Sequence, residues 1–387
     1  MSRLDELFQE LCPNGVPFVK IQDCCVLEKG KTPIQKAVPG EYPLVVTTAE
    51  RKNANTYQFD KPSVCIPLVS SRGHGVASLN EIFYQEGKFA LGNILCAVTP
   101  LHPDCLSAKF LHVYLNYAKD TLLVPQMKGG ANVSLSVDAI GRCKIPVPPI
   151  EVQREIVRIL DKFTELSAEL SAELSARQRQ YSYYREQLLT FRSSDESIQW
   201  YKLSEIASYK DGVAHERIMK DNGPYIVVKV RFISSNGSYR KYADTCLSPV
   251  AKDDTIMVMS DLPNGKSLAK CYLVEADNTY TINQRVCCLT PNKELVHPKF
   301  LYYVLNRNSQ LLKYDTGYTQ THLKKAWIQN IMVPIPPMFM QQHIVSILEH
   351  FDALCNDLSS GLPAEIEARQ KQYEYYRDKL LTFKPLA

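Results

Sequence analysis

The sequence lacks any hydrophobic run long enough to cross a membrane. A spanning helix needs roughly 18 consecutive apolar residues, and no stretch of the 387 residues approaches that length. The first ten residues, MSRLDELFQE, are polar and amphipathic and do not resemble a secretory signal. We therefore expect a cytoplasmic protein with no membrane partner.

Metal-binding and disulfide spacings are also missing. The chain has 12 cysteines, but they occur as two adjacent pairs, Cys24–Cys25 and Cys287–Cys288, and as scattered single residues, with no CxxC motif. This pattern favours reduced, mostly buried thiols and argues against a zinc site. We expect no metal ion in this chain.

No strong excess of one charge is present. The 45 basic residues nearly balance the 41 acidic ones, which leaves a net charge of +4. Such a charge permits a nucleic-acid partner but does not require one. The hydrophobic fraction of 45% is ordinary for a globular protein.

Recognisable catalytic motifs are absent as well. The chain contains no GxGxxG, HExxH or GxSxG motif, and no Asn/Asp-Pro-Pro-Tyr/Phe tetrapeptide of the kind that DNA methyltransferases carry. Lys31–Thr32 and Lys266–Ser267 follow glycines like the tail of a phosphate-binding loop, but each lacks the upstream glycine. Glu86–Lys88 could belong to a nuclease site, but no convincing aspartate precedes it. A binding protein explains these absences better than an enzyme does.

The sequence does contain a long internal repeat. Ala176–Phe191 reads ARQRQYSYYREQLLTF and Ala368–Phe383 reads ARQKQYEYYRDKLLTF, with 12 of 16 positions identical. Each copy follows a PxPP segment, at 146–149 and 334–337, and about 145 residues that match only faintly precede each helix. A repeat of this period decides the architecture: one scaffold carries two divergent modules.

Both modules read as mixed α/β. In the first, the runs 43–47, 63–69 and 89–98 are rich in apolar and β-branched residues and predict strands, and 110–116 predicts a helix. The runs 224–230, 280–291 and 300–306 follow in the same order in the second. We therefore expect two modules of one fold whose loops differ.

A long helix with a coiled-coil seam should follow each PxPP segment. Apolar residues step by three, four or seven along each copy, and two such helices in one chain can pack antiparallel around a pseudo-two-fold axis. The first seam comprises Ile156, Leu160, Phe163, Leu166, Leu170, Leu174, Tyr181, Tyr184, Leu188 and Phe191. The second comprises Ile344, Leu348, Phe351, Leu354, Leu358, Ile366, Tyr373, Tyr376, Leu380 and Phe383.

The two helices differ in their middle parts. Glu165–Ala176 is three tandem copies of ELSA, each adding about 6 Å of helix. The second copy has Gly361 and Pro363 at the corresponding place, and these residues predict a break near 361–363.

The strongest candidates for DNA contact lie in polar, glycine-containing loops between apolar runs. Glycine lets the backbone approach a phosphate, while Arg, Lys, Asn and Gln offer paired hydrogen bonds to base edges. The alternative reading is a solvated loop with incidental charge. The candidates are Ser71, Arg72, His74, Lys128 and Asn132 in the first module, and Asn264, Lys266, Lys270, Thr319, Gln320 and His322 in the second. Lys324–Lys325 reads as a phosphate contact or a plain solvated pair.

Together these features resemble the specificity subunit of type I restriction–modification enzymes. The resemblance covers essentially the whole chain. It rests on the PxPP segments, the helix starts EIVRILDKF and HIVSILEHF, the ARQxQYxYYRxxLLTF ends and the tetrapeptide run, which is typical of one subgroup.

The resemblance implies a non-catalytic subunit that recognises DNA. Each module would be a target recognition domain reading one half of an asymmetric, interrupted site. The helices would set the spacer and dock two methyltransferase subunits, and in the subgroup tetrapeptide number is tied to spacer length. S-adenosylmethionine, ATP and magnesium would belong to the methyltransferase and translocating restriction subunits, which methylate adenine and cleave DNA. The residues expected on the partner-binding helices are Ile156, Leu160, Phe163, Tyr181, Tyr184, Ile344, Leu348, Phe351, Tyr373 and Tyr376.

We therefore expect an α/β (α+β) chain with recognition domains at 1–147 and 193–335 and helices at 148–192 and 336–387. Two other classes remain open on the sequence alone. One is a single-chain methyltransferase or nuclease, and the other is a coiled-coil adaptor that binds two proteins and no DNA.

Overall fold

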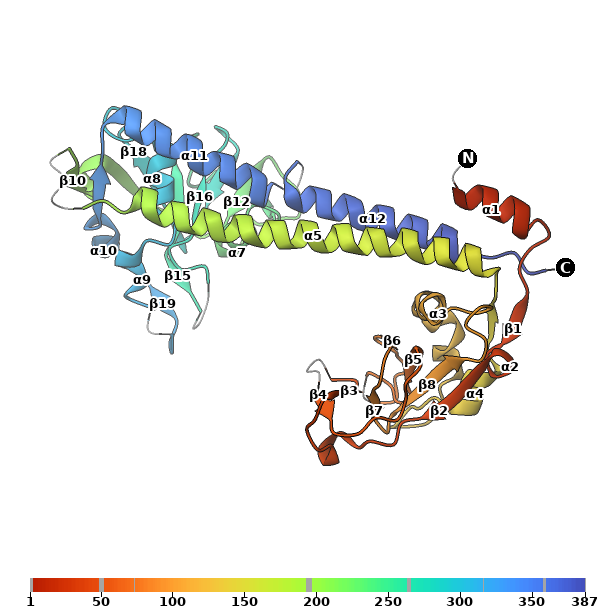
Figure 1. Ribbon diagram of the computed structural model, residues 1–387. Helices are drawn as coiled ribbons and strands as arrows, with labels where there is room; N and C mark the ends of the chain where they lie inside the picture. Colours follow the sequence, from red (N-terminus) through yellow and green to blue (C-terminus); the bar gives the residue numbers. More distant parts are fainter. Residues whose placement is uncertain are drawn as a thin grey trace. The chain divides into compact units, whose positions relative to one another are not determined.

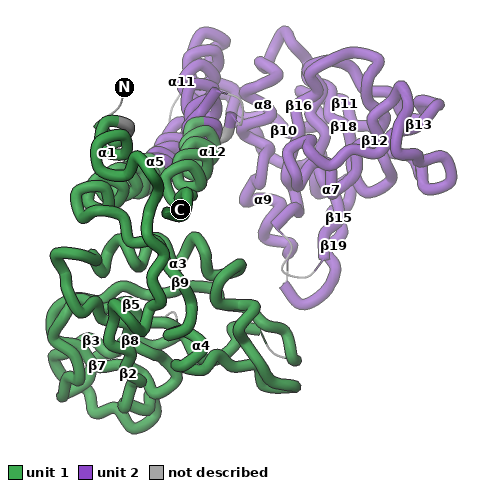
Figure 2. The backbone as a smooth tube through the Cα atoms, turned by 90° about the vertical axis from the view of Figure 1, so that its right-hand side faces the viewer, with its two compact units in different colours: residues 1–172, 365–387 green, residues 173–364 purple. Residues whose placement is uncertain are grey.

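The computed structural model describes residues 3–48, 52–72, 74–192, 197–262, 266–315, 317–357 and 360–386. The chain forms two compact units (Figure 2). Unit 1 contains Met1–Ala172 and Glu365–Ala387, and unit 2 contains Glu173–Ala364. Each unit is thus larger than the predicted recognition domain, because it also takes in parts of the long helices.

The first module is built on two sheets. A four-stranded antiparallel sheet has the order β2-β8-β5-β6, and a three-stranded sheet has the order β4-β3-β7, with β3 and β7 parallel. β5 is buried along its whole length, which fits its apolar sequence SVCIP. The strands are β1 (Phe18–Lys20), β2 (Cys25–Lys29), β3 (Tyr42–Val45), β4 (Lys52–Ala54), β5 (Ser63–Pro67), β6 (Phe83–Gln85), β7 (Ala90–Leu91), β8 (Leu95–Pro100) and β9 (Lys144–Pro146).

The second module repeats this topology and adds a short strand pair, β15 and β19. Its four-stranded sheet has the order β11-β18-β14-β16 and its three-stranded sheet the order β13-β12-β17, again with one parallel pair. The strands are β10 (Gln199–Lys202), β11 (Ala207–Asp211), β12 (Tyr225–Val228), β13 (Tyr242–Ala243), β14 (Thr255–Val258), β15 (Ser260–Asp261), β16 (Cys271–Leu273), β17 (Tyr280–Ile282), β18 (Val286–Pro291), β19 (Thr321–His322) and β20 (Met332–Ile335). The prediction of two modules with one mixed α/β fold is confirmed.

Two predicted strands were wrong in detail. The run 89–98 is two strands, β7 and β8, which belong to different sheets, and the run 280–291 divides in the same way into β17 and β18. Asn93 and Ile94 form the turn between β7 and β8, and the Leu95 amide donates to the Gly92 carbonyl over 3.0 Å. The chain therefore leaves one sheet and enters the other within a few residues.

Helices pack on these sheets and connect the modules (Figure 1). α5 is continuous over 40 residues, in keeping with its many Ala, Leu, Glu, Gln and Arg residues and its lack of Gly and Pro. Among the residues that the structure describes, none of the helices is both long and apolar enough to span a bilayer. The unit 1 helices are α1 (Arg3–Leu11), α2 (Ile21–Cys24), η1 (Ile34–Lys36), α3 (Ala108–Leu122), η2 (Val124–Gln126) and α4 (Val137–Arg142), followed by α5 (Ile150–Leu189), which passes into unit 2. The unit 2 helices are α6 (Leu203–Ile206), α7 (Val230–Ser234), α8 (Pro298–Leu305), α9 (Ser309–Leu312), α10 (Lys325–Gln329) and α11 (Met338–Asn356), followed by α12 (Leu362–Leu381), which passes into unit 1.

The two helices of the repeat run antiparallel within each unit. In unit 1 the start of α5 meets the end of α12: Phe163 stacks on Tyr376 with ring centroids 5.5 Å apart. In unit 2 the end of α5 meets α11, and Tyr184 stacks on Phe351 at 5.6 Å. The predicted antiparallel seam is therefore present in both units as the same aromatic pair.

Each core is closed by the end of the other repeat's helix. Phe383 packs edge-on against Phe110 of α3 at 6.1 Å, and Phe191 packs in the same way against Phe300 of α8 at 6.4 Å. Leu380 and Leu381 belong to the buried core of the first module, and Leu188 and Leu189 pack against that of the second.

A buried glutamine fixes the start of each long helix. The Gln153 side chain is 0% exposed; its amide nitrogen donates to the Cys105 and Pro148 carbonyls, and its oxygen accepts from the Ser107 amide. Gln341 makes the equivalent three bonds with Leu295, Pro336 and His297. Each glutamine thus joins the PxPP segment to the beginning of α3 or α8.

The second repeat helix is interrupted where the sequence predicts it. α11 ends at Asn356 and α12 begins at Leu362, so Pro363 sits in the first turn of a new helix, where it is tolerated. A Cβ atom at position 361 would lie 2.6 Å from the carbonyl oxygen of Ala353 in α11. The close approach of this residue to the end of α11 therefore requires glycine. Leu358, assigned to the predicted seam, lies outside the described residues.

We predict that Gln153→Leu destabilises unit 1 by about 2 to 4 kcal/mol, because it leaves two buried carbonyls and one buried amide without partners. Denaturant unfolding of the full chain, with hydrogen exchange of the first α3 amides, measures this loss. Gln187→Leu, at an exposed position of the same helix, is the control. A change no larger than that of the control would contradict the role assigned to Gln153.

Candidate nucleic-acid interface

The candidate loops come together in pairs. In the first module the loop after β5 meets the loop before α4: the Ser70 amide donates to the Val133 carbonyl over 3.0 Å, and the Gly75 amide donates to Ala131 over 3.2 Å. In the second module β15 pairs with β19, so Ser260 lies opposite His322. Both pairs follow the same strand of the repeated sheet, β5 or β14. Residues about 60 positions apart in the sequence thus form one surface in each module.

Hydrogen bonds brace both loop pairs internally. The Ser71 hydroxyl donates to Asn80 Oδ1 over 2.9 Å. The Asp261 carboxylate accepts from the Leu262 and Ser267 amides over 2.9 and 2.7 Å, and Gln320 Nε2 donates to the Ser260 hydroxyl over 3.0 Å. Such bracing holds polar side chains in place without a bound partner, which limits the ordering cost of binding.

Most of the predicted contact residues lie exposed on these surfaces. Arg72, His74, Lys128 and Asn132 are exposed in the first module, as are Lys266, Thr319, Gln320 and His322 in the second. His74 adopts a positive φ of 61°, so the backbone presents it at a tight turn. Gly73 and residues 263–265, which include Asn264, lie outside the described residues.

Lys270 has a different environment. Its Nζ donates to the Ser234 carbonyl over 3.1 Å, and burial, together with the nearby Arg307 charge, lowers its pKa. The side chain of this lysine thus bonds the backbone at the end of α7. The structure therefore assigns it a bond within the module.

Two exposed hydrophobic residues were not predicted from the sequence. Tyr318 is 90% exposed and Leu262 is 66% exposed, and both belong to the loop pair of the second module. A large apolar side chain in a polar, glycine-containing loop was the available signal. Such residues contact thymine methyl groups or stack on bases in protein–DNA complexes.

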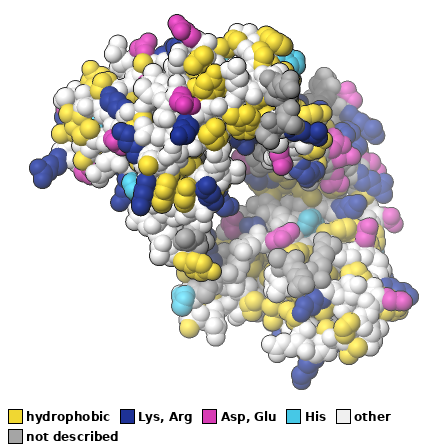
Figure 3. Space-filling view, turned by 90° about the vertical axis from the view of Figure 1, so that its left-hand side faces the viewer, with side chains coloured by type: hydrophobic (Ala, Val, Ile, Leu, Met, Phe, Trp, Pro, Cys, Tyr) yellow, Lys and Arg dark blue, Asp and Glu magenta, His cyan; other side chains and the backbone are white. Residues whose placement is uncertain are grey.

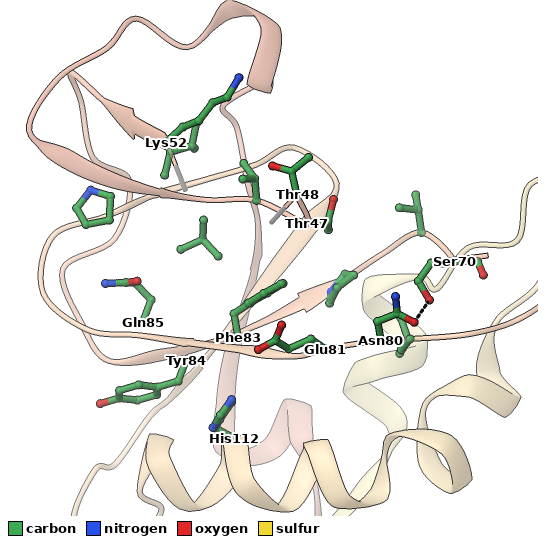
Figure 4. A pocket seen from close by; sticks show the side chains of 18 of the residues that line it. Thr47, Thr48, Lys52, Ser70, Asn80, Glu81, Phe83, Tyr84, Gln85 and His112 are labelled. Atoms are coloured by element: carbon green, nitrogen blue, oxygen red, sulfur yellow. Dashed lines mark hydrogen bonds between the residues drawn. The ribbon is translucent and has the colours of Figure 1, made fainter. Parts of the chain in front are cut away.

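A polar groove lies beside the loop pair of the first module (Figure 4). It has a volume of about 870 Å³ and lies between β3–β4 and β5–β6. Burial lowers the pKa of His112 at its floor, where the imidazole bonds the Ile82 carbonyl over 2.9 Å. Side chains that can donate or accept hydrogen bonds around the groove include Thr47, Lys52, Ser70, Asn80 and Gln85. None of Thr47, Lys52 and Gln85 was a sequence candidate, because they come from separate strands.

The alternative enzymatic motifs are engaged in local contacts. Lys31 pairs with Glu28 at 3.0 Å, and a side chain at Gly30 would meet the Gly92 carbonyl at 2.2 Å. Glu86 accepts a hydrogen bond from Tyr84 over 2.6 Å, while Lys88 lies over the Tyr57 ring at 4.8 Å. These side chains support the edges of the first module and do not converge on a common point.

Several residues expected on the partner-binding helices are buried within this chain. Ile156, Leu160, Ile344 and Leu348 are at most 4% exposed and belong to the two module cores. Phe163, Phe351, Tyr181, Tyr184, Tyr373 and Tyr376 form the aromatic contacts between antiparallel helices. Their visible role is packing within the chain, and the expected contact of these residues with a partner stays a prediction.

Comparison with known proteins identifies the family. The model of the type I restriction modification DNA specificity domain matches residues 13–177 and again 196–368. The chain belongs to this family. The two matches cover the two modules and the first part of the helix that follows each, and they end where the most similar repeat segments begin.

Similar whole proteins have the same description. A type I restriction enzyme specificity subunit of Escherichia coli, EcoR124I/EcoR124II, is 34% identical over 303 residues, covering 72% of this chain and 73% of that subunit. A putative type I specificity subunit of Mycoplasma pneumoniae is 28% identical over 374 residues, covering 93% and 96%. The solved S subunit from M. genitalium has the same fold, with a TM-score of 0.56, 16% identity and 95% coverage of both chains.

Proposed function

We propose that this chain is the DNA-reading subunit of a type I restriction–modification complex. Each module reads one half of a bipartite target through its paired loops, and the chain itself is not catalytic. The observation that carries this proposal is the pairing of divergent polar loops at the same place on two modules of one fold. One scaffold with two different reading surfaces suits an asymmetric target.

Catalysis would belong to the partners. We propose that two methyltransferase subunits supply S-adenosylmethionine chemistry on adenine, and that restriction subunits supply ATP- and magnesium-dependent translocation and cleavage. A solved protein similar in fold, with a TM-score of 0.57 and 14% identity, comes from work on complex assembly and conformational transition of the type I R–M system. The wider assembly is part of the proposal.

Genome-wide adenine methylation tests the proposal. We expect an interrupted motif in cells that carry this chain with its methyltransferase subunit, and loss of that motif when the chain is deleted. His322→Ala, at an exposed position of the second loop pair, should relax one half-site and leave the other intact. Unchanged methylation from an assembled complex would favour an adaptor that binds two proteins and no DNA.

The tetrapeptide run supports a second part of the proposal, that α5 acts as a ruler. All twelve of its residues are helical, so each ELSA unit is a fixed increment of length. Removing Glu169–Ala172 would shorten the helix by about 6 Å and rotate its remaining C-terminal part by about 40°.

We predict that deleting Glu169–Ala172 changes the number of unspecified bases between the half-sites and leaves both half-sites unaltered. Ser171→Ala keeps the helix length and serves as the control. The methylation motif reports both effects at once. A changed base preference in either half-site would contradict the ruler.

The outer faces of the two repeated helix ends carry the same exposed residues, which supports the docking of two copies of one partner. Gln178 and Gln370 are identical and exposed, and so are Tyr183 and Tyr375, which are 60% and 63% exposed. Each of these tyrosines touches the neighbouring seam ring, Tyr184 or Tyr376, and leaves most of its own side chain open to solvent in both copies. Large aromatic residues are common anchors of protein interfaces. We propose that each methyltransferase subunit docks on one of these faces.

We predict that the double variant Tyr183→Ala/Tyr375→Ala weakens each methyltransferase contact about thirtyfold, as expected for loss of roughly 2 kcal/mol at an interface anchor. Native mass spectrometry of the titrated complex gives stoichiometry and affinity. The control is Lys379→Ala, because this exposed residue of α12 corresponds to a different residue, Gln187, in the first copy. Equal assembly of the double variant and the control would place the docking face elsewhere.

A further inference from the structure

Two aromatic rings of the second module form a tight stack beside its reading loops. Tyr314 and Trp327 lie with centroids 3.9 Å apart and planes within 6° of parallel. Lys313 Nζ lies 5.1 Å from the Tyr314 centroid, and Lys324 Nζ lies 5.1 Å from the Trp327 centroid. The space between the rings is too narrow for an ammonium group, so the two cations occupy the outer faces of the stack.

A third lysine is held in the same way next to this stack. Lys325 Nζ lies 4.8 Å from the centroid of Tyr209, whose hydroxyl donates to Asp211 over 2.6 Å. All three lysines are exposed, while the rings below them are half-buried. The aromatic faces therefore hold three ammonium groups at defined positions that still face solvent.

The three lysines have no acidic partners in the part of the chain that the structure describes, and this points to an anionic ligand. Among the described residues, no carboxylate lies within ion-pair distance of Lys313, Lys324 or Lys325, whereas Lys220, Lys241, Lys293 and Lys299 of the same unit all have acidic partners. Each cation–π contact stabilises one ammonium group, but no acidic side chain that the structure describes offsets the three like charges.

The cluster adjoins the paired loops. Lys324 follows His322 of β19 by two residues, and the Leu323 amide between them donates to the Met259 carbonyl over 2.7 Å. That bond joins the lysines to the segment between β14 and β15. Lys324 and Lys325 thus follow the loop pair directly in the chain, and the stack of Tyr314 on Trp327 places Lys313 in the same cluster.

We propose that Lys313, Lys324 and Lys325 form a phosphate clamp that grips the DNA backbone beside the half-site read by the second module. This inference rests on the proposed function. The clamp adds affinity and fixes orientation, and it carries no base preference, because phosphates are the same at every step.

The first module provides an internal comparison. α4 is the counterpart of α10, and it has Ser136, Val137 and Ala139 where the second module has Lys324, Lys325 and Trp327. Neither the cations nor the aromatic platform has a counterpart at these positions. The clamp therefore belongs to one half of the bipartite interface.

The test measures DNA affinity of the assembled complex with its methyltransferase subunits as a function of salt. The variant is Lys324→Gln/Lys325→Gln, extended by Lys313→Gln. The control is Lys252→Gln/Lys293→Gln, which removes the same charge from the opposite end of the four-stranded sheet: Lys252 precedes β14, and Lys293 follows β18. One probe is a duplex that contains the sequence motif identified by methylation mapping. The other is a duplex of equal length that lacks this motif.

We expect the magnitude of the slope of log K against log salt to decrease by about 2 for the double variant and about 3 for the triple variant. DNA binding should weaken equally for both duplexes. The control should keep the wild-type slope. An unchanged slope in a complex that still prefers its motif would overturn the clamp and leave the proposed function intact. Selective loss of motif preference would show that these lysines contact bases. Loss of subunit assembly would show that they contact an acidic protein surface. Either result overturns the clamp. A wild-type complex without motif preference would overturn the proposed function and the clamp with it.

Discussion

The fold depends on an exchange of aromatic residues between the two repeats. Phe383 closes the core beside Phe110, and Phe191 closes the core beside Phe300, so each module is completed by the last turn of the other repeat's helix. Burial of such rings contributes strongly to stability, and edge-on pairs add to it. Neither half of the chain contains all the residues of its own core. The duplication is therefore a requirement of packing as well as a record of how the sequence is organised.

The packing residues of the scaffold are constrained, whereas the loops are free to differ. Residues that build the exchanged contacts, the buried glutamines and the outer tyrosines are the same in both copies, while the paired loops share almost nothing. Gln153 and Gln341 couple these parts, because each ties the PxPP exit of its module to the helix that leaves it. A loop can change without disturbing the helices, since its bracing bonds remain within the loop pair and the adjoining strand ends. This separation lets one scaffold present two unrelated reading surfaces.

The sequence predicts the repeat, the seam and the helix break because each rests on local periodicity or on a single Gly or Pro. It also singles out the polar, glycine-containing loops through their composition, and their contact with DNA stays a prediction. It does not predict that the loops meet in pairs, since the bond from Ser70 to Val133 spans more than 60 residues without any periodic pattern. The seam residues read as an exposed partner surface, but Ile156 and Leu348 are buried because the module itself covers them. The stack of Tyr314 on Trp327 was beyond sequence reasoning for the same reason: a loop and a short helix bring the two rings together.

The two modules place their polar groups differently, which bears on how a nearly neutral chain handles DNA. Lys and Arg side chains are spread among acidic and hydrophobic ones on the visible face (Figure 3), in line with a net charge of only +4. Attraction for phosphate must then come from a few well-placed cations or from the partners. The second module gathers cations on aromatic faces, whereas the first offers a groove of hydrogen-bonding side chains with Lys52 at its rim. On the proposed function, the second half-site would owe more of its affinity to cations that act on any sequence. The first would depend more on hydrogen-bonding groups, which can discriminate between base edges.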